Sequence, residues 1–101
     1  MNLTIDIALQ DDEFTVIEEN GVDMNILLSR VAGKYYATSD TCSHAKIRLS
    51  TGFLSGHTII CPLHGARFNL HSGRCVLGPT NRSIRTYPVS VQGDRIVIAI
   101  D

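Results

Sequence analysis

The sequence predicts an all-β fold, and three observations support this. Near the N-terminus apolar and polar residues alternate with a period of two, as they do in a half-buried strand. Short apolar runs are separated by turn-forming pairs that contain glycine. No apolar stripe of helical spacing extends beyond one or two turns. With 101 residues, 44% of them hydrophobic, the chain is expected to form one domain with a modest core.

The expected strands lie in the two outer thirds of the chain. The first covers residues 3–9, where Leu3, Ile5 and Ile7 alternate with other residues. Further strands are expected over residues 14–17, 25–31, 34–38, 84–91 and 95–100. Together these segments should form the supporting sheet structure of the domain.

Turn residues separate these runs. Asn20-Gly21 and Ala32-Gly33 are placed to form hairpin turns, and residues 92–94 read as a third turn. Pro88 has no N–H to donate, so it fits an edge position or a bulge within its strand.

The middle of the chain is different in composition. Residues 40–80 are rich in Gly, Ser, His and Cys, and their apolar stretches are short. We expect a loop-rich subdomain there, held together by something other than hydrophobic burial. In this prediction residues 1–101 form a single domain, in which residues 1–39 and 81–101 form the basal part.

The charge balance excludes some partners. Nine basic side chains oppose ten acidic ones, for a net charge of −1, which argues against nucleic-acid binding through a basic surface. Residues 1–40 carry most of the acids, and residues 41–101 carry most of the bases. No apolar run is long enough to span a membrane, and no secretory signal is visible, so a cytoplasmic protein is expected. Three cysteines suggest metal binding rather than a disulfide framework.

Four residues form the most specific pattern in the chain. Cys42-Ser43-His44 is followed, 16 residues further on, by Cys61-Pro62-Leu63-His64. Two thiolates and two imidazoles suit a tetrahedral zinc ion, but zinc sites usually pair Cys with Cys and His with His. Here each short segment offers one sulfur and one nitrogen. That arrangement favours a two-iron cluster with both cysteines on one iron and both histidines on the other.

These motifs resemble those of the Rieske-type ferredoxins of bacterial ring-hydroxylating dioxygenase systems. The resemblance covers essentially the whole chain and includes residues 61–68, Ser72-Gly73-Arg74 and Gly78-Pro79. It implies an antiparallel β-sandwich or barrel with a small cluster-binding subdomain, and one [2Fe–2S] cluster on Cys42, His44, Cys61 and His64. It also implies an electron carrier without catalytic residues or a small-molecule substrate. Its partners would be a flavin-dependent NAD(P)H reductase and a terminal oxygenase.

The chain departs from the pattern of respiratory Rieske proteins. Leu49 and Ser50 follow the first ligand pair and no cysteine lies near His64, so the disulfide that ties the two loops together in those relatives cannot form. Ala66 and Phe68 stand where those relatives carry hydroxyl donors to the cluster sulfurs. Such donors stabilise the reduced cluster, so the resemblance implies a potential near the low end of the Rieske range.

The remaining chemistry-bearing residues have simpler interpretations. Cys75 is expected to be a small buried hydrophobe, and His57 and His71 to be exposed turn residues. Leu49, Leu63 and Pro79 are expected to shield the cluster from water. The following basic residues are candidates for a face that docks acidic partners: Lys46, Arg48, Arg67 and Arg82.

Three alternatives stand beside the electron carrier. A structural Cys₂His₂ zinc module would be colourless and contain no iron. The small subunit of a nitrite-reductase-like enzyme shares the fold, but often lacks the four ligands. A catalytic Rieske oxygenase needs a separate mononuclear iron site with two histidines and a carboxylate, and about 100 residues leave no room for one.

Overall fold

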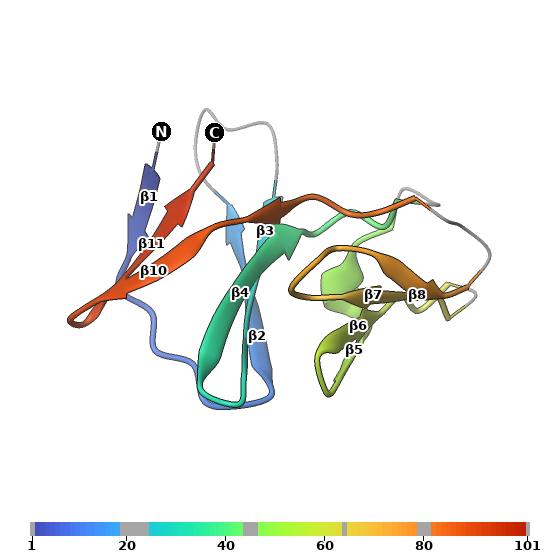
Figure 1. Ribbon diagram of the computed structural model, residues 1–101, viewed down its shortest axis with the longest axis horizontal. Coiled ribbons are helices and arrows are strands. Elements are labelled where there is room, and N and C mark those ends of the chain that lie inside the picture. Colours follow the sequence, from blue (N-terminus) through green and yellow to red (C-terminus); the bar gives the residue numbers. More distant parts are fainter. Residues whose placement is uncertain (1, 19–24, 44–46, 64, 79–81, 101) are drawn as a thin grey trace.

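The computed structural model describes residues 2–18, 25–43, 47–63, 65–78 and 82–100, and the regular secondary structure within them consists almost entirely of antiparallel strands (Figure 1). The strands are β1 (Asn2–Ile5), β2 (Glu13–Glu18), β3 (Asn25–Val31), β4 (Lys34–Ser39), β5 (Phe53–Ser55), β6 (Thr58–Ile60), β7 (Arg67–Asn69), β8 (Cys75–Leu77), β9 (Thr86–Tyr87), β10 (Val89–Gln92) and β11 (Arg95–Ala99). A single 3₁₀ turn, η1 (Leu49–Thr51), precedes β5. The all-β prediction is confirmed, and no described helix has the length and apolar character needed to cross a membrane.

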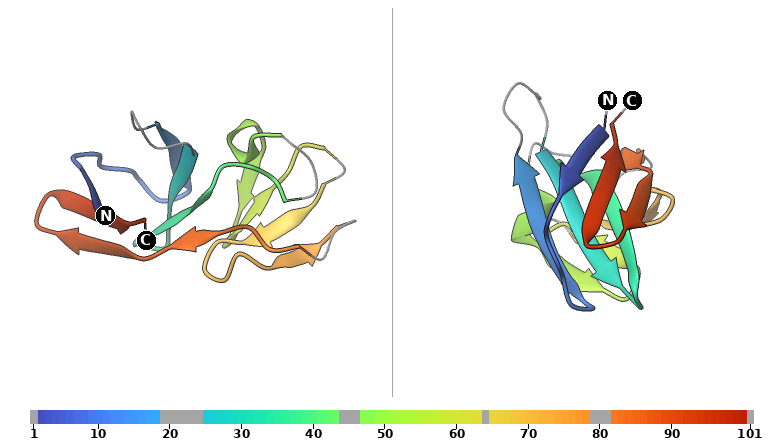
Figure 2. Two further views of the ribbon diagram at one scale, coloured as in Figure 1. Left: turned by 90° about the horizontal axis from the view of Figure 1, so that it is seen from above. Right: turned by 90° about the vertical axis from the view of Figure 1, so that its left-hand side faces the viewer.

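The strands form three sheets. The first has the order β1-β11-β10, the second β2-β3-β4-β9, and the third β5-β6-β7-β8. Along the longest axis of the molecule, the first sheet lies at one end and the third at the other (Figures 1 and 2). In the loop-rich middle region, four short strands pair with one another.

Strand β3 is covered on both of its faces. Ile26 and Leu28 belong to the apolar core shared with the first sheet, whereas Leu27 and Val31 belong to the core shared with the third sheet. Successive side chains of a strand point to opposite faces, so a strand between two cores must be apolar at nearly every position. This explains the unbroken Ile26-Leu27-Leu28 run, and it makes the second sheet the layer on which the other two pack.

Pro88 marks the place where the chain passes from one sheet to another. The strand expected over residues 84–91 is divided, because β9 pairs with β4 of the second sheet and β10 pairs with β11 of the first. Pro88 lies between them and accepts a hydrogen bond from the Ala99 N–H at 2.9 Å. A residue without an N–H is well tolerated where ladder pairing changes partner. Pro88 thus lies between two edge strands, β9 and β10, rather than within the single long strand that was expected.

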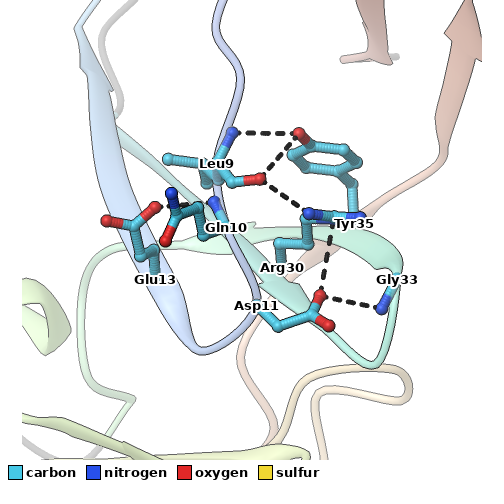
Figure 3. A network of polar contacts seen from close by, with 7 residues as sticks. All are labelled: Leu9, Gln10, Asp11, Glu13, Arg30, Gly33 and Tyr35. Carbon is cyan, nitrogen blue, oxygen red and sulfur yellow. Dashed lines mark hydrogen bonds and ion pairs between the residues drawn. The ribbon is translucent and has the colours of Figure 1, made fainter.

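The N-terminal strand is shorter than predicted and ends at Ile5 rather than Leu9. Side chains from β3 and β4 form hydrogen bonds with the backbone N–H and carbonyl of Leu9, as Figure 3 shows. The Leu9 N–H donates to the Tyr35 hydroxyl at 3.0 Å, and Arg30 Nη1 donates to the Leu9 carbonyl at 2.9 Å. These bonds hold the segment in a loop, because the groups that a continued strand would need are already paired.

The predicted hairpin turns are present wherever the structure describes them. Ala32 and Gly33 both have positive φ, 52° and 80°, as a two-residue turn of the primed type requires. Asp11 Oδ1 accepts the Gly33 N–H at 2.9 Å and so joins this turn to the β1–β2 connection (Figure 3). The β10–β11 turn contains Gly93 with φ 63°. The expected Asn20-Gly21 turn lies outside the described residues.

Candidate metal centre

The first ligand segment is a tight loop that follows β4. An antiparallel bridge between Thr41 and Arg48 closes its base. One residue further in, the Cys42 N–H donates to the Ile47 carbonyl at 2.9 Å. Cys42 therefore lies where the loop leaves its two-stranded base. His44, the predicted nitrogen ligand of this loop, lies outside the described residues.

The second ligand segment connects β6 to β7 and is closed in the same way. The last pair of these strands is Ile60 with Arg67, and the Cys61 N–H donates to the Ala66 carbonyl at 2.7 Å. In both loops the cysteine N–H thus bonds the carbonyl five residues further on. This confirms that the two segments are built alike, as their sequences indicated. His64, like His44, lies outside the described residues.

The two cysteine side chains meet in the interior. Cys42 is 3% exposed and Cys61 is fully buried, and both belong to one apolar core. Burial raises the pKa of the Cys61 thiol, a backbone hydrogen bond with Leu63 lowers it, and a hydrogen bond and charge interaction with Cys42 raise it further. Two loops that are distant in sequence therefore bring their thiols into contact. Paired thiols in an apolar setting fit a shared iron–sulfur centre, which takes them as thiolates.

The full ligand set stays a prediction. Among the described residues no group of three or more Cys, His, Asp or Glu side chains is placed to hold a metal ion. The two described ligand candidates, Cys42 and Cys61, are brought together. The structure does not describe the two histidines.

A third segment lies against both loops. A Cβ added to Gly78 would stand 2.7 Å from the Ala66 Cα, so only glycine allows the backbone to approach the second loop this closely. The Ser43 hydroxyl donates to the Arg82 carbonyl at 2.7 Å and joins the same segment to the first loop. Pro79, expected to shield the cluster, lies outside the described residues.

Buried apolar residues share one core with the two thiols. Leu49, Ala66 and Phe68 are fully buried and share the core of Cys42 and Cys61. Ala66 and Phe68 thus fill their positions with hydrocarbon rather than with hydroxyl donors, as the sequence indicated. Leu63, in the second loop, is 40% exposed.

Among the described residues, the other cysteine and the remaining histidines form no metal-binding group with Cys42 and Cys61. Cys75 is half-buried in β8 and packs against the core, so it serves as a small apolar side chain. His57 and His71 are exposed turn residues, as predicted. Their rings lie edge-on to Tyr36, with centroid distances of 6.0 and 6.3 Å. This contact between β4 and two turns of the third sheet was not predictable from local sequence patterns.

Sequence reasoning also missed Asp40, which anchors the base of the first loop. Its carboxylate accepts the Ser50 N–H at 2.7 Å and the Ser50 hydroxyl at 2.8 Å. Its carbonyl accepts the Leu49 N–H at 2.7 Å. The only available signal was an acid just before the first cysteine, and such a residue is usually exposed.

The close packing of Gly78 on Ala66 can be tested by substitution. We expect Gly78→Ala to lower the free energy of unfolding by about 2–4 kcal/mol, since a methyl clash adds to the strain of an alanine at φ 139°. Denaturant unfolding and the iron content of the purified protein measure the effect. Gly56→Ala is the control, because Gly56 has φ 57° but no atom within 4 Å of the added Cβ. Equal losses in the two variants would contradict the close approach.

Comparisons with known proteins agree with this geometry. The family model of the Rieske [2Fe–2S] domain matches residues 5–88. The chain is 44% identical over 73 residues to the ferredoxin component of a naphthalene 1,2-dioxygenase system from Pseudomonas aeruginosa, covering 72% of this chain and 70% of the relative. It is 37% identical to the ferredoxin component of the naphthalene 1,2-dioxygenase/salicylate 5-hydroxylase systems of a Ralstonia species, covering 96% and 95%.

Solved structures separate a carrier from a catalytic oxygenase. The ferredoxin of carbazole 1,9a-dioxygenase from Nocardioides aromaticivorans superimposes with a TM-score of 0.86 at 29% identity, covering 97% of this chain and 98% of that one. The terminal oxygenase of the same system also matches, with a TM-score of 0.81 at 25% identity, but only 27% of its length is covered. The chain thus corresponds to a whole ferredoxin and to one part of an oxygenase. It belongs to the Rieske [2Fe–2S] family, among the electron-carrying ferredoxin components of dioxygenase systems.

Proposed function

We propose that this ferredoxin carries single electrons from a flavin-dependent NAD(P)H reductase to a terminal ring-hydroxylating oxygenase. The observation that supports this most directly is the contact between two buried thiols. They come from two loops that are closed by the same hydrogen bond, from the cysteine N–H to the carbonyl five residues further on. The family's cofactor is one [2Fe–2S] cluster. In this chain Cys42 and Cys61 would hold one iron, and His44 and His64 the other. The relatives named as dioxygenase ferredoxin components support the choice of partners.

We also propose that the single domain consists of two structural parts. Residues 40–80 form the cluster-binding subdomain and residues 1–39 and 81–101 the basal part of a single domain. The shared core of Leu27, Val31, Ile59 and Phe68 supports treating the two as one folding unit. Because the proposed reductase uses NAD(P)H, we also propose a cytoplasmic location for the protein.

A row of side chains beside the second loop is the proposed docking face for the oxygenase. Phe53, Ile60, Arg67 and Leu77 are paired in register across the four strands of the third sheet. Directly paired residues share a face, so these side chains form one strip across the sheet. Phe53 is 63% exposed and Leu77 is 60% exposed, so the strip presents large apolar groups to solvent. It also adjoins Cys61, Ala66 and Gly78 directly in sequence, which places it next to the centre.

The charge of this region indicates the chemistry of the partner. The segment from Thr41 to Gly93 contains six basic residues and no aspartate or glutamate. Arg67 is exposed within the strip, while Arg48 is paired with Glu18 at 3.0 Å. Lys46 lies outside the described residues. An oxygenase surface with apolar side chains among carboxylates would complement this face.

The ligand assignment is tested by removing one imidazole. We expect His64→Ala to lose the visible absorption and the rhombic reduced-state EPR signal of the cluster, because a missing ligand leaves one iron uncompleted. His71→Ala is the control and keeps both spectra, since His71 is an exposed turn residue. A complete two-iron spectrum in His64→Ala would show that the ligand set is wrong.

The reduction potential is expected near −150 mV, at the low end of the Rieske range. The physical reason is that Ala66 and Phe68 offer no hydroxyl to stabilise the more negative reduced state. A redox titration followed by visible absorption measures it. A clearly positive midpoint would contradict the expectation.

The docking face is tested by comparing two equally exposed apolar residues. We expect Leu77→Ser to lower the second-order rate of oxygenase reduction by about fivefold to tenfold, because an apolar contact is lost while the potential stays unchanged. Val91→Ser is the matched control, since Val91 is 59% exposed on β10 of the first sheet, at the other end of the molecule (Figure 1). The wild-type rate is expected to fall as salt is added. Equal rates for the two variants would exclude this strip as the docking face.

A further inference from the structure

Asp40 is the one charged residue that lies in the protein interior, among the described residues. It is fully buried, in company with Ser29 and Thr38, which are neutral. Burial of a carboxylate is costly unless strong donors replace water, so a buried aspartate calls for a specific physical role.

Ser50 supplies the donors. Its N–H reaches Asp40 Oδ1 at 2.7 Å and its hydroxyl reaches Oδ2 at 2.8 Å, so each carboxylate oxygen accepts one short hydrogen bond. These lengths are typical of bonds to a charged acceptor. Within the described part of the chain, no lysine or arginine side chain forms an ion pair with this carboxylate. Its negative charge is therefore held in place without a neutralising cation there.

The charge is held close to the centre. Asp40 precedes Cys42 by two residues, so their Cα atoms are at most about 7 Å apart. Leu49, which donates its N–H to the Asp40 carbonyl, packs in the same apolar core as Cys42 and Cys61. The medium around the thiols is thus hydrocarbon rather than water, and it screens a nearby charge weakly.

We propose that Asp40 lowers the reduction potential of this ferredoxin through its buried negative charge. The inference rests on the proposed function, since it takes Cys42 and Cys61 as cluster ligands. With the cluster bound, its reduction would take up one electron from the reductase and add one negative charge to the centre. Since Asp40 precedes Cys42 by two residues, its fixed negative charge lies on the order of 10 Å from the centre, where it opposes that step and favours onward donation of the electron. At an effective dielectric constant of about 20, the expected effect on the equilibrium constant of reduction is roughly tenfold.

The experiment is a redox titration of the cluster-loaded Asp40→Asn variant. Asparagine keeps the size of the side chain and removes its charge. We expect the midpoint to rise by about 59 mV, the equivalent of a tenfold change for one electron, with unchanged visible and EPR spectra. Asp6→Asn is the control and leaves the midpoint where it is, because Asp6 is 77% exposed and lies in the first connection of the basal part.

A charge swap separates the charge from its position in the sequence. In the double variant Asp40→Asn/Ser50→Asp, the carboxylate stands at position 50 instead of position 40 of the same hydrogen-bonded pair. The reduction midpoint of this variant is expected to return toward the wild-type value. If Asp40→Asn holds no cluster, Asp40→Ser, which is also neutral and is smaller, gives the same comparison. A neutral variant with intact spectra and the wild-type midpoint overturns the role of Asp40. Wild-type protein without iron and acid-labile sulfide would instead overturn the proposed function.

Discussion

The meeting of the Cys42 and Cys61 thiols inside the protein is the constraint on which the rest of the structure depends. Each thiol comes from a separate loop, and each loop uses the N–H of its own cysteine for closure. Backbone hydrogen bonds therefore close both loops, and the sulfurs are directed inward rather than toward water. Burial and the contact with Cys42 raise the pKa of the Cys61 thiol, so its thiolate is costly there unless a metal takes up the charge. Folding and cluster binding should consequently be coupled in this part of the chain.

The same core that holds the thiols also joins the sheets. Leu27 and Val31 of β3 pack with Ile59 and Phe68 of the third sheet, and the cysteines lie among them. Because β3 also packs on the first sheet through Ile26 and Leu28, a displacement of one sheet would be felt at the centre. The basal strands therefore contribute directly to the centre, because side chains of β3 form part of the apolar core that surrounds the two cysteines.

Charges of opposite sign lie at the surface and in the interior. The segment from Thr41 to Gly93 holds no acid, and its five arginines are exposed at the surface. In the interior, Asp40 is the one charged group among the described residues. The surface charge acts on a protein partner across water, where salt screens it, whereas the interior charge acts on the electron at short range. Association and potential can therefore be tuned by different residues.

The sequence by itself determined what depends on neighbours along the chain. Period-two alternation and turn pairs such as Ala32-Gly33 predicted the strands, and the two Cys–His segments predicted the centre, since spacing fixes what one loop can offer. The structure describes only the cysteines of that set, and it brings them together. The end of β1 at Ile5 was not predictable, because Tyr35 and Arg30, from strands far along the chain, take the backbone groups of Leu9. The change of sheet at Pro88, the approach of Gly78 to Ala66 and the burial of Asp40 against Ser50 were likewise decided in the tertiary structure. Local patterns report the backbone a segment prefers, whereas the pairing of distant strands decides which side chains become neighbours.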